Sequence, residues 1–174
     1  MGEIKESDIN LDIALRLERM LTEKGYEVEM TRRDNGGLCN EGEKWTKDSD
    51  MQIRKNQIVS GEYDLFLSVH QNSHSDTSCR GGQVFYSDSN PENGILADIV
   101  QEKLKKCAPF ENRRSALINN DYKLLRGNSM PSAIIECGFM TCPSELELLL
   151  DENYKEKIAE YIAEGIDEYI KNRN

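Results

Sequence analysis

The sequence predicts a single α/β domain over residues 1–174, with a mostly parallel, mixed sheet and helices on both of its faces. Short apolar stretches at 64–70, 82–86 and 133–135 alternate along the chain with longer segments of helical periodicity. This alternation is typical of α/β proteins. A length of 174 residues suits one domain with a real core, and no repeat or linker indicates a second one.

The first half begins with a predicted helix over 8–24. Its apolar residues recur on one face: Ile9, Ile13, Leu17, Met20 and Leu21. Ser7 or Asp8 is expected to cap its start, and Gly25 to end it. Alternating residues then predict a strand at 26–31.

A long polar loop is expected over 33–49, followed by a short helix that ends near Gly61. The apolar run 64–70 reads as a strand buried on both faces, and 82–86 as the next strand.

In the second half we expect a helix over about 92–106, with inward-facing residues Ile95, Leu96, Ile99, Val100 and Leu104. Residues 107–131 are mixed, with short strand-like pieces. A third apolar strand covers 133–135. The last helix, about 153–171, carries one stripe: Ile158, Ile162, Ile166 and Ile170.

Composition excludes several classes of function. The net charge of −10 and pI of about 4.8 argue against nucleic acid as a partner. No apolar run has the ~20 residues of a membrane span, and residues 1–6 do not resemble a signal segment. The five cysteines are expected to be mostly buried and reduced, although a Cys39–Cys79 disulfide stays possible. We expect a monomer.

Two ionisable residues directly follow apolar strands, namely His70 and Glu136. Ligands of α/β sheets bind at the carboxyl ends of strands, so both side chains are expected at one edge of the sheet. Imidazole is a common metal ligand and base, although His70 alone reads equally as a buried, hydrogen-bonded residue. A carboxylate such as Glu136 is costly to bury without a partner, but it can also reach solvent at a strand end.

Other candidates are weaker. Asn72 could bind substrate or cap a loop, and Arg126 could contact a substrate carboxylate. His74 reads as an exposed loop residue, and Cys137 should point away from Glu136 on its strand. No GxSxG, phosphate-loop or GxGxxG motif is present.

Five ordered blocks of sequence resemble the zinc-dependent N-acetylmuramoyl-L-alanine amidases of the amidase-3 family. They lie at 4–11, 25–32, 64–73 (DLFLSVHQNS), 81–86 (GGQVFY) and 131–139 (PSAIIECGF). The resemblance covers nearly the whole chain. Within the family, the third and fourth blocks look most like the germination-specific branch of spore-forming bacteria.

The resemblance implies that Glu6 and His70 are ligands of Zn²⁺ and that Glu136 is the catalytic glutamate. It further implies hydrolysis of the peptidoglycan amide bond between N-acetylmuramic acid and L-alanine, at the cell wall or in the spore envelope. Zinc would activate water, and Glu136 would move the proton to the leaving amine.

One family feature has no counterpart here. The family begins with a strand ending in His-Gly-Gly, which supplies another histidine ligand. We therefore expect two protein ligands where catalytic zinc usually has three, weak zinc binding by this chain, and an in-frame His-Gly-Gly strand upstream of Met1. Two alternatives stay open: an amidase-like domain that only binds wall peptides or a partner protein, and a different metallohydrolase, such as a peptidase.

Overall fold

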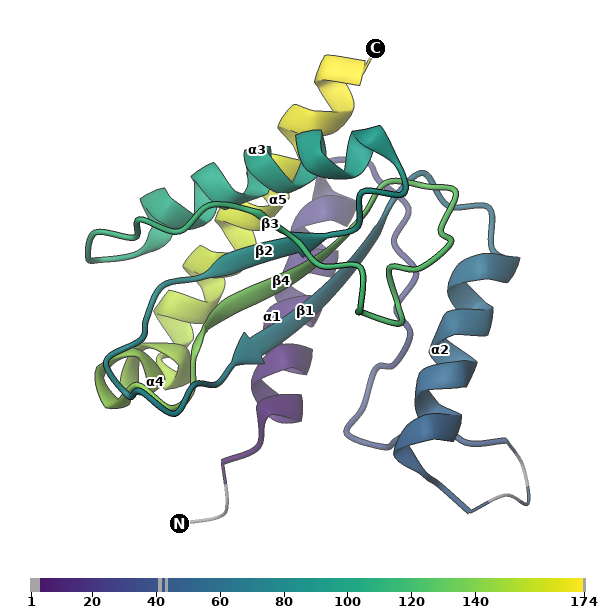
Figure 1. Cartoon of the computed structure of the whole chain (residues 1–174), viewed down its shortest axis with the longest axis horizontal. Helices are drawn as coiled ribbons and strands as arrows, with labels where there is room; N and C mark the ends of the chain where they lie inside the picture. Colours follow the sequence, from purple (N-terminus) through teal and green to yellow (C-terminus); the bar gives the residue numbers. More distant parts are fainter. Residues whose placement is uncertain (1–3, 41, 43, 174) are drawn as a thin grey trace.

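The computed structural model describes residues 4–40, 42 and 44–173 of the chain (Figure 1). In chain order, its helices and strands are α1 (Glu6–Glu23), α2 (Lys47–Ser60), β1 (Phe66–Asn72), β2 (Gln83–Tyr86), α3 (Pro91–Cys107), β3 (Leu117–Ile118), β4 (Ser132–Phe139), α4 (Pro143–Leu150) and α5 (Glu152–Arg173). The α/β class that the sequence predicts is confirmed, and the helix after Pro143 was not expected.

The sheet has the order β1-β4-β2-β3. β4 pairs with β1 in parallel and with β2 antiparallel, and β2 pairs with β3 in parallel. The sheet is therefore mixed. Every residue of β4 is buried, as expected for a central strand between two neighbours and two covered faces, and this explains the apolar run 133–135 within it.

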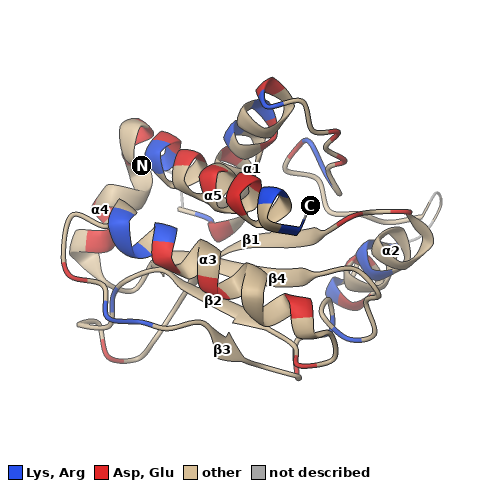
Figure 2. Cartoon of the chain, turned by 90° about the horizontal axis from the view of Figure 1, so that it is seen from above, with Lys and Arg blue, Asp and Glu red and all other residues tan. Residues whose placement is uncertain are grey.

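One face of the sheet carries the main core. Helices α1, α3 and α5 lie together on this face, with α5 in contact with both of the others (Figures 1 and 2). Apolar side chains from these helices and from β2 and β4 form one buried cluster, which includes Ile13, Leu96, Ile135 and Ile162. Figure 2 shows charged residues along all three helices, whereas their buried residues are mainly apolar. The helices are therefore amphipathic.

The opposite face has a much smaller apolar cluster. Ile58 of α2 packs there with Leu124 and Met130 from the irregular segment before β4, and Phe66 of β1 joins them. Leu65, just before β1, and Leu67 and Val69 within it pack against the main core instead. The alternation of side chains along a strand therefore places Ser68 and His70 on the same face as Phe66.

The region 26–31 is not a strand, which contradicts the prediction. Its alternation has another cause: Tyr26 and Val28 pack against the main core, and the Tyr26 hydroxyl donates a hydrogen bond to Asp167 of α5 at 2.7 Å. A strand needs a partner for its backbone groups, and no strand in the described part of the chain pairs with this segment.

Two smaller expectations about helices are also wrong. The residue that caps α1 is Lys5, without a side-chain hydrogen bond, rather than Ser7 or Asp8. Ile95 of α3 is 51% exposed rather than inward-facing. The end of α1 at Gly25 is confirmed, because this glycine has a φ of 91°, a left-handed conformation that glycine adopts readily.

β2 approaches β4 closely at Gly82. A Cβ atom at this position would lie 2.9 Å from the carbonyl oxygen of Cys137, so the strand pairing requires glycine. None of the helices in the described ranges has the length and apolar character needed to cross a membrane.

Candidate active site

His70 and Glu136 lie side by side near the carboxyl ends of β1 and β4. They are paired residues in the parallel register of these strands, so the structure brings together the two side chains that the sequence singled out. Between His70 and Asn72 the register shifts, so that Asn72 pairs with Phe139. This irregularity inserts one extra residue in β4 and places Phe139 on the face of Asn72 and His70.

Glu6 reaches this pair from the first turn of α1. Its Oε1 lies 3.0 Å from His70 Nδ1 and accepts hydrogen bonds from Asn10 Nδ2 at 2.9 Å and from the Gln71 amide at 3.2 Å. Partial burial alone would raise the pKa of Glu6, but the hydrogen bonds from His70, Asn10 and Gln71 outweigh it and lower the pKa to about 2. Glu6 is therefore a carboxylate at neutral pH.

Glu136 occupies the opposite kind of environment. Its side chain is only 8% exposed, and its buried Oε2 has no hydrogen-bond partner in the described part of the chain. Burial raises the pKa of Glu136; the charge of His70 lowers it, the charge of Glu6 raises it, and the Tyr122 hydroxyl lowers it. A carboxylate with a raised pKa and an unpartnered oxygen is suited to accept and return a proton.

Tyr122 is a site residue that the sequence did not reveal. Its ring packs on Phe85 of β2, with ring centroids 5.6 Å apart. Burial and the charge of Glu136 raise the pKa of its hydroxyl, which keeps it protonated and able to donate. Tyr122 lies in the irregular segment 119–131, where no periodicity points to one residue.

Glu6 and His70 fit a zinc ion as two ligands. Imidazole nitrogen and carboxylate oxygen are both ligands of catalytic zinc, and the 3.0 Å contact shows that the two groups converge on one point. Within the described residues, no group of three or more His, Cys, Asp or Glu side chains is arranged to hold a metal ion. The described donors therefore account for two ligands.

Asn72 and Arg126 have local roles in the structure. Asn72 Oδ1 accepts a hydrogen bond from the Ser73 amide at 2.8 Å, which is the loop-capping alternative. Arg126 is exposed, and it donates to the Asn120 carbonyl at 3.0 Å and pairs with Asp121 at 3.4 Å. A substrate contact of either residue stays a prediction. His74 is exposed in the loop after β1, as expected.

Glu145 of α4 is a second residue that the sequence did not reveal. It is 1% exposed, and its two carboxylate oxygens accept hydrogen bonds from the backbone amides of Gly81, at 2.9 Å, and Phe139, at 2.8 Å. Burial raises the pKa of this carboxyl, and the two amides lower it. Glu145 thereby ties the loop before β2 to the end of β4, close to Glu136.

The cysteines take no visible part in the site. All five are free thiols, and Cys107, Cys137 and Cys142 are buried. Cys137 packs in the main core, on the face away from Glu136, and burial raises the pKa of its thiol. No Cys39–Cys79 disulfide forms, and the expectation of mostly buried, reduced thiols is confirmed.

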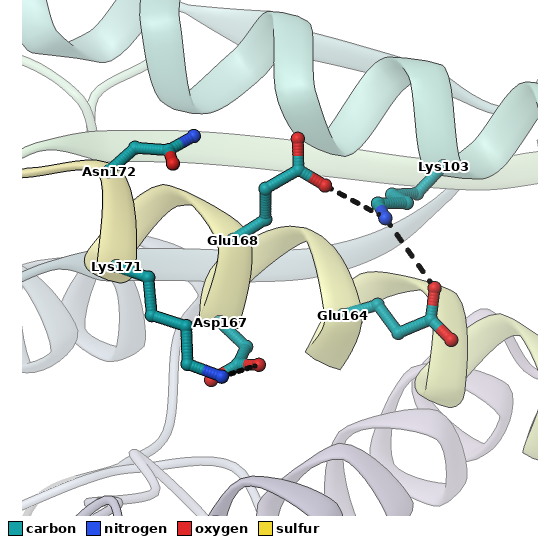
Figure 3. Close-up of a pocket in the computed structure, with 6 residues that line it drawn as sticks. All are labelled: Lys103, Glu164, Asp167, Glu168, Lys171 and Asn172. Carbon is teal, nitrogen blue, oxygen red and sulfur yellow. Dashed lines mark hydrogen bonds and ion pairs between the residues drawn. The ribbon is translucent and has the colours of Figure 1, made fainter.

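A surface hollow between α3 and α5 lies on the helix-covered side of the sheet, away from His70 and Glu136 (Figure 3). Its charged groups are already paired: Lys103 lies 2.9 Å from Glu168 and 3.5 Å from Glu164, and Lys171 lies 2.8 Å from Asp167. The chemically distinctive residues are those at the strand ends.

Comparison with known proteins agrees with this geometry. The chain resembles the germination-specific N-acetylmuramoyl-L-alanine amidase of Bacillus subtilis (strain 168), with 33% identity over 172 residues, covering 97% of this chain and 72% of the relative. Among solved structures it resembles the CwlD amidase of Clostridioides difficile in complex with the GerS lipoprotein, with a TM-score of 0.92 and 34% identity, covering 97% of this chain and 88% of that one.

A second solved structure, an N-acetylmuramoyl-L-alanine amidase from Clostridium difficile 630, has a TM-score of 0.85 and 26% identity, covering 99% of this chain and 88% of that one. The sequence model of the N-acetylmuramoyl-L-alanine amidases matches residues 1–168. Since this match spans almost the entire chain and agrees in fold with solved members, the chain belongs to the amidase-3 family of N-acetylmuramoyl-L-alanine amidases.

Proposed function

We propose that this protein hydrolyses the peptidoglycan amide bond between the lactyl group of N-acetylmuramic acid and L-alanine of the stem peptide. The observation that carries the proposal is the convergence of Glu6, His70 and Glu136 at the strand ends, with two residues suited to hold a metal and one suited to move a proton. Family membership supplies the substrate class.

In this proposal Glu6 and His70 would hold a zinc ion, and the chemistry that it would supply there is that of a Lewis acid. Glu136 accepts a proton from the attacking water and returns it to the leaving amine. Its buried, unpartnered Oε2 is available for that proton. The Tyr122 hydroxyl limits how far the pKa of Glu136 rises, so that the carboxyl can both take up and release a proton.

The relatives point to a biological setting. The Bacillus subtilis relative is a germination-specific amidase, and the Clostridioides difficile relative forms a complex with a lipoprotein. We extend the proposal to spore-cortex peptidoglycan as the substrate and to a lipoprotein as a partner. Co-purification of the tagged chain with lipoproteins of its own host would test the partner.

Digestion of purified peptidoglycan followed by mass spectrometry tests the activity. Free stem peptides that begin with L-alanine are expected from the wild-type chain with zinc, and not from Glu136→Gln. Glu147→Gln is a matched control, because Glu147 is an exposed residue of α4. The zinc content is a separate readout: His70→Ala should lose zinc, whereas Glu136→Gln should keep it.

A second function is favoured by one observation. Within the described residues no third metal donor joins Glu6 and His70, which favours a domain that binds wall peptides or a partner protein without cutting. Intact muropeptides after digestion, together with retained peptide binding, would support this function against hydrolysis. Cleavage inside the stem peptide would indicate a peptidase instead.

A further inference from the structure

A row of polar side chains crosses the site face of the sheet. His70 of β1 pairs with Glu136 of β4, and Glu136 pairs in turn with Gln83 of β2. Directly opposite residues of an antiparallel pair have side chains on the same face, so Gln83 lies beside Glu136. Gln83 Nε2 donates to the Ser115 carbonyl at 3.0 Å, which carries the row on to the segment before β3.

Arg114 stands at the end of this row. Its Nη1 donates to Gln83 Oε1 at 2.9 Å and its Nε donates to the Arg80 carbonyl at 2.9 Å. The guanidinium lies over the Phe139 ring, 4.5 Å from the ring centroid. These three contacts fix the partly exposed guanidinium of Arg114 on the face that carries Glu136, and only the Gln83 side chain separates Arg114 from Glu136.

The Arg114 guanidinium has no ion-pair partner of its own in the described part of the chain, and its Nη2 makes no hydrogen bond there. Its charge lowers the pKa of Glu145, but that carboxylate is buried and already bonded to the amides of Gly81 and Phe139. In a chain with 32 acidic residues, an arginine fixed in place without a carboxylate partner has unused capacity to bind one.

We propose that Arg114 binds a carboxylate of the stem peptide and so selects substrates with a free carboxylate on the second amino acid. This inference rests on the proposed function. Neighbouring strands lie ~4.8 Å apart, so Arg114, beyond Gln83, is roughly two strand spacings from Glu136. A peptide extends by ~3.5 Å per residue, so the carboxylate of the second residue after the scissile amide lies at a comparable distance.

Such a cation has a further use in this protein. The net charge of −10 repels an acidic peptide, and a guanidinium fixed one side chain away from Glu136 offsets that repulsion where the peptide is proposed to lie. Its planar fork matches a carboxylate in a way that an ammonium group does not.

Binding measured by calorimetric titration tests the inference apart from hydrolysis. The probes are N-acetylmuramoyl-L-alanyl-D-glutamate with its γ-carboxyl blocked as a methylamide, and the α-amide of the same compound, so that they differ only in the α-carboxylate and no second carboxylate competes for Arg114. The protein is the full chain carrying Glu136→Gln, so that neither probe is cut. The free carboxylate is expected to bind about tenfold or more tightly than the amide, as a charged hydrogen bond implies. Arg114→Gln should bring this ratio to near one, and Arg114→Lys to an intermediate value.

One matched control and one rival position carry the same substitution. Arg113→Gln changes an exposed neighbour that pairs with Glu111 and should keep the wild-type ratio. Arg126→Gln changes the other arginine considered for a carboxylate contact, so it decides between the two positions. Because the ratio compares two ligands on one protein, a partly unfolded variant does not alter it. A ratio near one in the parent chain, no detectable binding of the free carboxylate, or a ratio lost in Arg126→Gln but kept in Arg114→Gln would overturn the proposal. Hydrolysis by the wild-type chain, measured separately, bears only on the proposed function.

Discussion

The two faces of the sheet differ in what they contain. The face under α1, α3 and α5 is a continuous apolar core with many fully buried residues. The other face has the small cluster of Ile58, Leu124 and Met130 and the polar row from His70 to Arg114. The irregular segment 119–131 contributes to this face. The stability of the fold is therefore concentrated on one face, and the chemistry on the other.

The site face contains buried polar groups that destabilise the fold. Glu136 is buried, and one of its oxygens has no hydrogen-bond partner among the described residues. Burial of an incompletely satisfied polar group costs on the order of 1–3 kcal/mol. Apolar burial on the helical face offsets this cost. Substitutions on the helical face should therefore change mainly the free energy of unfolding, whereas substitutions at the site should change mainly the activity.

The largest effect on stability is expected on the helical face. Ile162 of α5 is 0% exposed in the main core, and Ile162→Ala should lower the free energy of unfolding by about 3–4 kcal/mol, because a large-to-small change leaves a cavity among packed neighbours. Urea denaturation followed by circular dichroism measures it.

Ile58→Ala is the matched change on the site face. Ile58 is 2% exposed but packs in the small cluster, so the same truncation should cost only about 2 kcal/mol, at the lower end for isoleucine. Equal losses for both variants would show that the two faces contribute equally, contrary to the comparison.

The difference between the faces also explains which parts of the structure could be predicted from sequence. Regular periodicity indicates which side chains are buried, so the stripe on α5 and the burial of β4 were predicted correctly. The strand β1 was also predicted, but its burial on both faces is wrong: β1 is an edge strand, and most of its residues are only partly buried. The 26–31 segment failed because alternation reports one buried side and does not report whether a partner strand is present.

On the site face, prediction succeeded only where topology fixes the position. His70 and Glu136 follow apolar strands, and parallel pairing brings strand ends together. Glu6 could be assigned only through the family resemblance, because nothing in its local sequence differs from an ordinary acidic helix start. Tyr122 and Arg114 lie in irregular chain, where contacts depend on tertiary structure and leave no periodic signal.

The second effect in size concerns the link between the loop before β2 and the end of β4. Glu145→Gln replaces one carboxylate oxygen with an amide NH2 group, which cannot accept a hydrogen bond. The Gly81 amide contacts both oxygens of Glu145 and the Phe139 amide contacts Oε2, so the change removes the carboxylate charge and places a donor against a buried N–H. Losing part of this buried hydrogen bonding should lower the free energy of unfolding by about 2 kcal/mol. Glu147→Gln, exposed on the same helix, should change it by less than about 0.5 kcal/mol. Similar values for the two variants would contradict this role of Glu145.

A smaller effect is expected at Tyr122, and in activity rather than stability. Tyr122→Phe keeps the ring packed on Phe85 but removes the hydroxyl that acts on Glu136. If the chain hydrolyses muropeptides as proposed, kcat/KM should fall by roughly five- to tenfold, which is about 1 kcal/mol in transition-state stabilisation. Tyr161→Phe, which changes a hydroxyl on α5 in the same way, should leave kcat/KM unchanged. An unaltered rate in Tyr122→Phe would remove Tyr122 from the site.

The smallest effect is expected in the charged contacts that join α1 to α5 outside the main core. Asp12 of α1 forms an ion pair with Lys155 of α5 and lies 2.7 Å from Arg16. Burial alone would raise the pKa of Asp12, but the hydrogen bonds from Lys155 and Arg16 bring it below the ordinary value of 3.8. A carboxyl whose pKa is lowered by folding stabilises the protein at pH values above 3.8, and the stabilisation is lost as the pH falls towards the folded-state pKa. Because the pair is partly exposed, Asp12→Asn should lower the free energy of unfolding by only about 0.5–1 kcal/mol at neutral pH. That difference should shrink as denaturation is repeated at increasingly acidic pH and as salt is added. Asp98→Asn on α3, where the described chain offers no ion pair, should show neither dependence. A cost at Asp12 that stays constant from neutral to acidic pH would mean that packing, rather than charge, holds α1 against α5 at this point, and the polar contacts of the helical face would then add nothing to its apolar core.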